Sequence, residues 1–284
     1  MKIITPDYYQ NFKCIADRCR HSCCIGWEIE VDPLTLGRYQ SIPDVRTHIT
    51  PEGTIALVGE RCPFLNERGL CNIICTYGEE ALCRICTDHP RFRNFYSDRI
   101  EVGLGLCCEA AAELILSYPS SVKWTSFEGA PLPEERAFFA LRQQIFDILQ
   151  DRTRTVDERV EKMLALCGAE LPEKTSAEWT QIYLSLEQLD PVWRDILLAE
   201  PRQKMDDPLG FEQLLVYFIY RHLADALEEG GFRERVLFAA LSYQMIRQIW
   251  SANPELSLQE IARMYSAEIE YSDENMKSIL NLFV

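Results

Sequence analysis

The chain has 284 residues, and its hydrophobic content of 47% can build the core of one large or two ordinary globular domains, which excludes a disordered protein. The net charge is -15 and is uneven: residues 1–108 hold 12 Lys and Arg against 14 Asp and Glu, whereas residues 109–284 hold 17 against 30. Because an acidic chain repels phosphate backbones, nucleic acid is not expected as a partner.

The sequence predicts neither a membrane span nor a secretory leader. No apolar run approaches the ~20 residues that a transmembrane helix needs, and the run Leu214–Tyr220 stops at Arg221. Pro6 and Asp7 come too early for the apolar core of a signal peptide. We therefore expect a cytoplasmic protein without membrane insertion, in a compartment where thiols stay reduced.

Eleven of the twelve cysteines fall within 95 residues, from Cys14 to Cys108. Thiolates that lie close in sequence suit soft metals, because several sulfurs must converge on one ion or cluster. A disulfide framework is disfavoured by the reducing compartment. Packing of free cysteines as small hydrophobes suits Cys167, on an apolar helical stripe, better than the dense N-terminal set.

The first third of the chain is predicted to combine short β elements with helices. Strands are expected at 27–32, 54–58 and 100–106, and helices at 33–46, 77–88 and 109–117. Between Cys62 and Cys71, the turn-forming residues 66–69 predict a hairpin that brings these two thiols together.

The remainder is predicted to be helical almost throughout, beyond a boundary rich in Ser, Gly and Pro at residues 118–132. Helices are expected from Pro133 to 149, from the cap Thr155 to 166, and at 176–189, 192–199, 210–228, 232–250, 257–264 and 273–282. The predicted fold is thus mainly α, with a cysteine-rich module at 1–117, a linker at 118–132 and a helical domain at 133–284.

Five separated blocks of the sequence resemble the flagellin lysine-N-methylase family. They are CxxxxCxxxCCxGW from Cys14, CPFLxxxGLC from Cys62, Gly78–Leu82, Cys86 with Pro90-Arg91, and Leu106-Cys107 before the 109–116 helix; a looser similarity continues at 211–222. The resemblance implies an iron-sulfur cluster, usually [4Fe-4S], and transfer of methyl groups from S-adenosylmethionine to lysine side chains of flagellin.

The resemblance also implies the metal ligands of this chain. Carried over residue by residue, the family pattern falls on Cys14, Cys19, Cys23, Cys24, Cys62, Cys71, Cys86 and Cys107. This sequence departs from the pattern at Cys108, where the family usually has Pro, and it adds Cys75 and Cys83. Arg91 is a candidate cofactor-binding residue, because its charge would offset that of a thiolate-bound cluster.

Several alternatives stay open at the level of the residues. Four cysteines bind structural zinc as readily as an iron-sulfur cluster, so zinc is the alternative metal, and the protein could be a non-catalytic metal-binding module. An iron-sulfur redox or radical enzyme is a further alternative, although the common radical motif CxxxCxxC is absent. Among possible catalytic groups, His89 and His222 are candidate bases, and Tyr8, Tyr96, Tyr217 and Tyr220 are candidate aromatic walls for a lysine.

Overall fold

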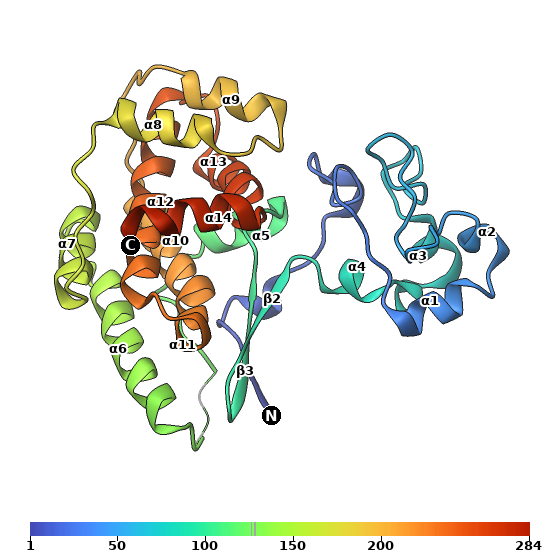
Figure 1. Ribbon diagram of the computed structural model, residues 1–284, viewed down its shortest axis with the longest axis horizontal. Coiled ribbons are helices and arrows are strands. Elements are labelled where there is room, and N and C mark those ends of the chain that lie inside the picture. The colour runs from blue at the N-terminus through green and yellow to red at the C-terminus, as the bar shows by residue number, and fades with distance from the viewer. Residues whose placement is uncertain (126, 128) are drawn as a thin grey trace. The chain divides into compact units, whose positions relative to one another are not determined.

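The computed structural model describes residues 1–125, 127 and 129–284, and its elements confirm the predicted mainly α class (Figure 1). The chain divides into two compact units: a larger one of residues 1–12, 93–107 and 111–284, and a smaller one of residues 13–92 and 108–110. Of the predicted linker 118–132, residues 126 and 128 lie outside the described residues, and the rest falls within the larger unit.

A three-stranded sheet belongs to the larger unit for most of its length. It consists of β1 (Lys2–Ile4), β2 (Arg91–Phe95) and β3 (Arg99–Leu104) in the order β1-β3-β2, and β1 pairs in parallel with β3, Lys2 opposite Arg99. We predicted these segments within the cysteine-rich module. They cluster instead with the helices, since Asn94 donates a hydrogen bond to the carbonyl of Tyr220 at 3.0 Å.

The helices after residue 108 follow the predicted pattern closely. They are α5 (Glu109–Leu116), α6 (Pro133–Leu149), α7 (Val156–Leu166), α8 (Ser176–Ser185), α9 (Pro191–Leu198), α10 (Pro208–His222), α11 (Ala226–Glu229), α12 (Phe232–Ala252), α13 (Leu258–Tyr265) and α14 (Asp273–Leu280). The predicted helix 210–228 is interrupted after His222 by a 3-10 turn, Leu223–Asp225, before α11.

Helices α10 and α12 form the centre of the larger unit and lie side by side (Figure 1). Both are apolar around most of their circumference, which is typical of helices surrounded by protein. A buried ion pair ties α6 to the sheet: Arg142 donates to both carboxylate oxygens of Glu101, at 2.6 and 2.8 Å. Among the described residues, no helix has both the length and the apolar character needed to cross a membrane.

The smaller unit contains short elements: α1 (Pro33–Tyr39), α2 (Pro43–Arg46), α3 (Asn72–Tyr77) and α4 (Arg84–Asp88). The predicted helix 33–46 is broken because Pro43 has no N–H and starts a new helix. The predicted helix 77–88 is broken because Gly78, at φ +88°, ends α3 and a 3-10 turn precedes α4.

The strands predicted at 27–32 and 54–58 in the smaller unit do not form; these segments make only isolated β-bridges. Glu30 and Thr54 form a single antiparallel bridge, and the N–H of Ile55 donates to the carbonyl of Ile29 at 2.9 Å. Ile29 and Ile55 nevertheless face one core, which also contains Phe64 and Ile73 and several of the cysteines. The predicted alternation of apolar residues thus marks burial rather than a regular sheet.

Candidate functional site

Five cysteines of the smaller unit share its hydrophobic core. Cys62 and Cys83 are buried there, and Cys24, Cys71 and Cys86 are packed against the same core. We call these five residues the core thiol group. They are brought from three separate segments of the sequence, so the chain fold, rather than one local motif, collects them.

Thiol contacts within the core thiol group polarise its members. Hydrogen bonds from the thiols of Cys23 and Cys62 lower the pKa of Cys24, against the effect of burial. A hydrogen bond from Cys86 likewise lowers the pKa of Cys83. The donating thiols of Cys62 and Cys86 have raised pKa values, because each holds its proton between two sulfurs and because each is buried.

The predicted turn at residues 66–69 is confirmed and positions two of these thiols. The N–H of Asn66 donates to the carbonyl of Leu70 at 2.9 Å, and Gly69 adopts φ +74°. The arms pair through the bridge between Leu65 and Cys71, although the second arm continues as α3 rather than as a strand. Cys62 is fixed separately, by donating its N–H to the carbonyl of Cys24 at 2.8 Å.

A second set of thiols, Cys14, Cys19, Cys23 and Cys108, lies together in the smaller unit. Burial raises the pKa of Cys19, and Cys108 and Cys14 are close enough to raise it further. The hydrogen bond to Cys24 and burial raise the pKa of Cys23, and Cys14 and Cys108 again add to the effect. We call these four residues the outer thiol group.

Glu109 anchors the outer thiol group at the start of α5. The thiol of Cys19 donates to Oε2 of Glu109 at 3.8 Å, and Arg20 donates its backbone N–H to the same oxygen and its Nε to Oε1, both at 2.9 Å. Glu109 therefore holds the segment between Cys19 and Cys23 beside Cys108. The outer thiol group thus spans from the first cysteine of the dense stretch to the last.

Cys107, one of the predicted ligands, lies elsewhere. It is buried in the larger unit, where the hydroxyl of Tyr271 donates a hydrogen bond to its sulfur, and it is close enough to Arg221 to raise the pKa of that guanidinium. The next residue, Cys108, belongs to the smaller unit together with the other thiols of the outer thiol group. The structure brings Cys108 to them.

Arg91 and Cys75 stand at the edge of these groups. Arg91 donates to the carbonyl of Thr87 at 3.2 Å, and its charge lowers the pKa of His89, whose burial has the larger effect. Cys75 is exposed on α3, but it is close enough to Cys71 to raise the pKa of Cys71. Neither residue is part of the packed core of the smaller unit.

The cysteine thiols are suitable ligands for a thiophilic metal. However, their sulfur atoms do not surround a common position that a metal ion could occupy. In the part of the chain that the structure describes, no group of three or more His, Cys, Asp or Glu side chains has the geometry to hold a metal ion. Thiolates are the usual ligands of iron-sulfur clusters and of structural zinc. Each thiol group therefore supplies enough ligands for one centre, and coordination requires its sulfurs to draw together.

The larger unit contains a buried charged network around α10, of which the sequence analysis named only Tyr217 and His222 as candidate functional residues. Glu270 accepts hydrogen bonds from Tyr217 at 2.8 Å and His222 at 2.6 Å, and its Oε2 lies 3.3 Å from Nε of Arg221. Glu270 ends a π-helical segment, Ser266–Glu270, that follows α13. The signal for the network was the Arg221-His222 pair, which ends an otherwise apolar run.

The candidate base His222 and the candidate aromatic walls are all packed inside the protein. Tyr8, Tyr96, Tyr217 and Tyr220 are each at most 4% exposed, and His222 is 6% exposed. The hydroxyl of Tyr217 also accepts from the N–H of Leu106 at 3.2 Å. Hydrogen bonds of this kind provide partners for the hydroxyl groups of buried tyrosines, so the structure gives these residues a packing role.

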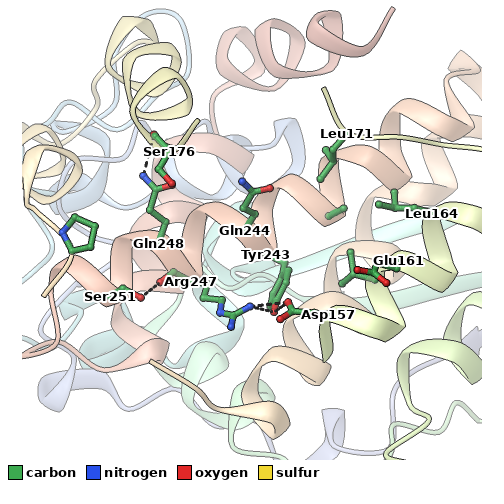
Figure 2. Close-up of a pocket in the computed structure, with 13 residues that line it drawn as sticks. Asp157, Glu161, Leu164, Leu171, Ser176, Tyr243, Gln244, Arg247, Gln248 and Ser251 are labelled. Carbon is green, nitrogen blue, oxygen red and sulfur yellow. Dashed lines mark hydrogen bonds and ion pairs between the residues drawn. The ribbon is translucent and has the colours of Figure 1, made fainter. Parts of the chain in front are cut away.

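A cavity of about 670 Å³ opens in the larger unit (Figure 2). Its residues come chiefly from α7 and α12: Asp157, Val160, Glu161, Leu164, Leu171, Ser176, Pro201, Ala240, Tyr243, Gln244, Arg247, Gln248 and Ser251. At one end, Asp157 accepts hydrogen bonds from Tyr243 and Arg247, each at 2.7 Å. This cavity was not detected by sequence analysis, because its polar residues are spread over 95 positions.

Comparison with known proteins supports the predicted resemblance. The chain is 30% identical over 140 residues to proteins named "Lysine-N-methylase" from Salmonella choleraesuis and Salmonella typhimurium, a match that covers 43% of this chain and 35% of each relative. It is 29% identical over 140 residues to the "Flagellar biosynthetic protein FliU" of Salmonella muenchen, of which it covers 83%.

The chain thus spans about a third of the length of the two lysine-N-methylases. No protein-family model and no solved structure matches it. The predicted resemblance is confirmed at this level: over part of its length, the chain is a homologue of proteins named lysine-N-methylase and FliU.

Proposed function

We propose that this protein is a lysine N-methyltransferase that uses S-adenosylmethionine to methylate lysine side chains of flagellin and that carries an iron-sulfur cluster. The observation that carries the proposal is the homology to lysine-N-methylases and to FliU. The two thiol groups support the cluster, because they gather seven of the eight family-pattern cysteines, all but Cys107, into one small unit. All twelve cysteines are free, so their thiols are available as metal ligands.

The proposed reaction is a direct methyl transfer. The lone pair of a neutral lysine amine attacks the methyl carbon, so that an N–C bond forms, the S–C bond breaks, and its electrons remain on sulfur as a thioether. A lysine amine has a pKa of ~10.4 and is therefore protonated at neutral pH. The enzyme must remove this proton before the amine can attack. The acidic excess of residues 109–284 favours the approach of a lysine-bearing surface.

The proposed cluster is held by cysteines of the smaller unit. Cys24, Cys62, Cys71 and Cys86 are the first candidates, with Cys83 as a fifth thiol in the same core. A bound [4Fe-4S] cluster supplies a covalent cross-link between four thiolates and a one-electron redox centre. Cys14, Cys19, Cys23 and Cys108 would hold a second centre, for which zinc is the alternative metal. Arg91 would offset the negative charge of these thiolates.

The test is mass spectrometry of flagellin after incubation with the purified protein and S-adenosylmethionine. We expect flagellin peptides to gain the mass of one or more methyl groups on lysine, and no gain when the protein or the donor is omitted. Unchanged flagellin, with the metal content of the protein intact, would overturn the proposal.

A non-catalytic metal-binding module is the second candidate, and the burial of Cys62 and Cys83 in a hydrophobic core favours it. In that case the metal would only hold the smaller unit together. Alanine at Cys62 separates the two, if folding is followed by circular dichroism and methylation by mass spectrometry. Loss of methylation in a protein that keeps its fold favours the enzyme.

A further inference from the structure

The cavity between α7 and α12 has the composition of a site for a small zwitterion with a large apolar body. We propose that it binds S-adenosylmethionine, and this inference rests on the proposed function. The cavity lies entirely within the larger unit, and its volume of about 670 Å³ falls in the usual range for small-molecule sites.

Arg247 offers two free donors to a ligand in the cavity. Its Nη1 donates to Asp157 at 2.7 Å and to the hydroxyl of Tyr243 at 2.8 Å. Within the described residues, Nε and Nη2 of Arg247 have no hydrogen-bond partner, and the side chain is 24% exposed. A guanidinium that is held by one edge and open at the other is suited to a carboxylate, such as that of the methionine part of the donor.

Asp157 fixes this arginine in place. Burial raises the pKa of Asp157, but the hydrogen bonds from Tyr243 and Arg247 outweigh it and lower the pKa overall, so Asp157 is charged at neutral pH. Figure 2 shows the three side chains converging at one end of the cavity. The arrangement holds Arg247 ready before any ligand arrives, which reduces the entropy cost of binding.

A second carboxylate makes the cavity suitable for a cation as well. Glu161 is exposed on α7, lines the cavity, and has no hydrogen bond or ion pair to any described residue. The ammonium and the sulfonium of S-adenosylmethionine are both cationic. Glu161 would therefore complement the positive part of the donor while Arg247 complements its carboxylate.

The remaining lining suits the nucleoside. Val160, Leu164, Leu171 and Ala240 supply apolar surface for an adenine ring. The amide of Gln244 has no partner among the described residues, and the buried Oε1 of Gln248 has none either, while Nε2 of Gln248 donates to Thr180 at 2.9 Å. An adenine amino group that entered the cavity would satisfy such an acceptor.

A lysine side chain of the protein substrate fits the cavity less well. It needs a carboxylate and an apolar channel, which Glu161 and Leu164 would provide, but the free edge of Arg247 would repel its ammonium. The combination of an open guanidinium with an open carboxylate therefore favours the zwitterionic donor.

The experiment is calorimetric titration of the full chain with S-adenosylmethionine and with S-adenosylhomocysteine, which lacks the sulfonium charge. We expect Arg247→Gln to weaken the binding of both by about tenfold or more, as for loss of a charge-assisted contact. Glu161→Gln should weaken S-adenosylmethionine more than S-adenosylhomocysteine. Arg233→Gln, an exposed position on the same helix, is the matched control and should bind both as the wild type does.

The outcomes separate this inference from the proposed function. Glu161 is exposed and has no hydrogen bond or ion pair within the described part of the chain, so we expect Glu161→Gln to keep the fold, and the test does not depend on Arg247 alone. Binding that is unchanged in both variants, or no binding by the wild type, overturns the assignment of the cavity. Weakened binding in the variants, together with wild-type protein that does not methylate flagellin, supports the cavity and overturns the proposed function.

Discussion

Glu270 is a buried carboxylate surrounded by groups that favour its charge. Burial raises its pKa, but Arg221 and the hydrogen bond from His222 act more strongly together and lower the pKa to about 2. Its side chain is completely buried at the end of the π-helical segment, so its partners replace the water that the carboxylate lost. Glu270 thus contributes stability only in its charged form.

The depressed pKa fixes the pH range in which this contribution disappears. It is present above the ordinary glutamate pKa of about 4.3 and is lost as the pH falls towards the folded value of about 2. At neutral pH, Glu270→Gln removes the carboxylate beside buried Arg221 and should cost about 3–5 kcal/mol in the free energy of unfolding.

Urea unfolding followed by circular dichroism checks this prediction. The difference between wild type and Glu270→Gln should shrink between about pH 4 and pH 2, since both proteins then lack the charge. The exposed pair of Arg202 and Glu255, 3.4 Å apart, supplies the control: Glu255→Gln should change stability by less than about 1 kcal/mol. A constant difference at every pH would contradict the role given to Glu270.

At the scale of elements, one side chain joins the starts of two helices in the smaller unit. Asp32 accepts the N–H of Thr35 in α1 at 3.0 Å and the N–H of Arg84 in α4 at 2.9 Å. These hydrogen bonds lower the pKa of Asp32, and the one from Arg84 has the largest effect. Because α4 carries Cys86 and follows Cys83, this contact positions two thiols of the core group.

Replacing Asp32 should therefore loosen both helices together. We expect Asp32→Ala to cost about 1–2 kcal/mol, the usual effect of losing a helix cap, and Asp32→Asn to cost less. Hydrogen exchange should become faster in residues 33–39 and 84–88 and stay unchanged in 208–222. Asp44→Ala, at an exposed position in α2, is the control. Faster exchange at 33–39 alone would show that Asp32 does not join the two helices.

The contrast between the two units explains what the sequence could predict at this scale. Helices of the larger unit carry their own signals, such as the cap Thr155, which accepts from Glu158 N–H at 3.3 Å, and Gly168 at φ +57° beyond α7. In the smaller unit, short elements depend on contacts far apart in sequence. The strand predicted at 27–32 did not form because it pairs with the segment 54–58 at one bridge only, Glu30 with Thr54.

In the whole molecule, too, features with a local sequence signal were predictable, and features that depend on contacts far apart in sequence were not. The density of cysteines predicted a metal-binding region, and the turn at residues 66–69 predicted the approach of Cys62 and Cys71, because both signals are local. The division of Cys23 and Cys24 between two thiol groups was not predictable, since it depends on Cys108, more than 80 positions away. The network around Glu270 and the cavity at Arg247 likewise need the assembled helices.

The most direct measurement is the iron, acid-labile sulfide and zinc content, with the visible spectrum, of protein purified without oxygen. Wild type and Cys75→Ser, at an exposed cysteine, should both contain iron and sulfide in equal amounts, about four of each per [4Fe-4S] cluster. Cys62→Ser, in the core thiol group, should lose both while the larger unit keeps its helical signal. Zinc without iron in the wild type, or undiminished iron in Cys62→Ser, would contradict the proposed cluster.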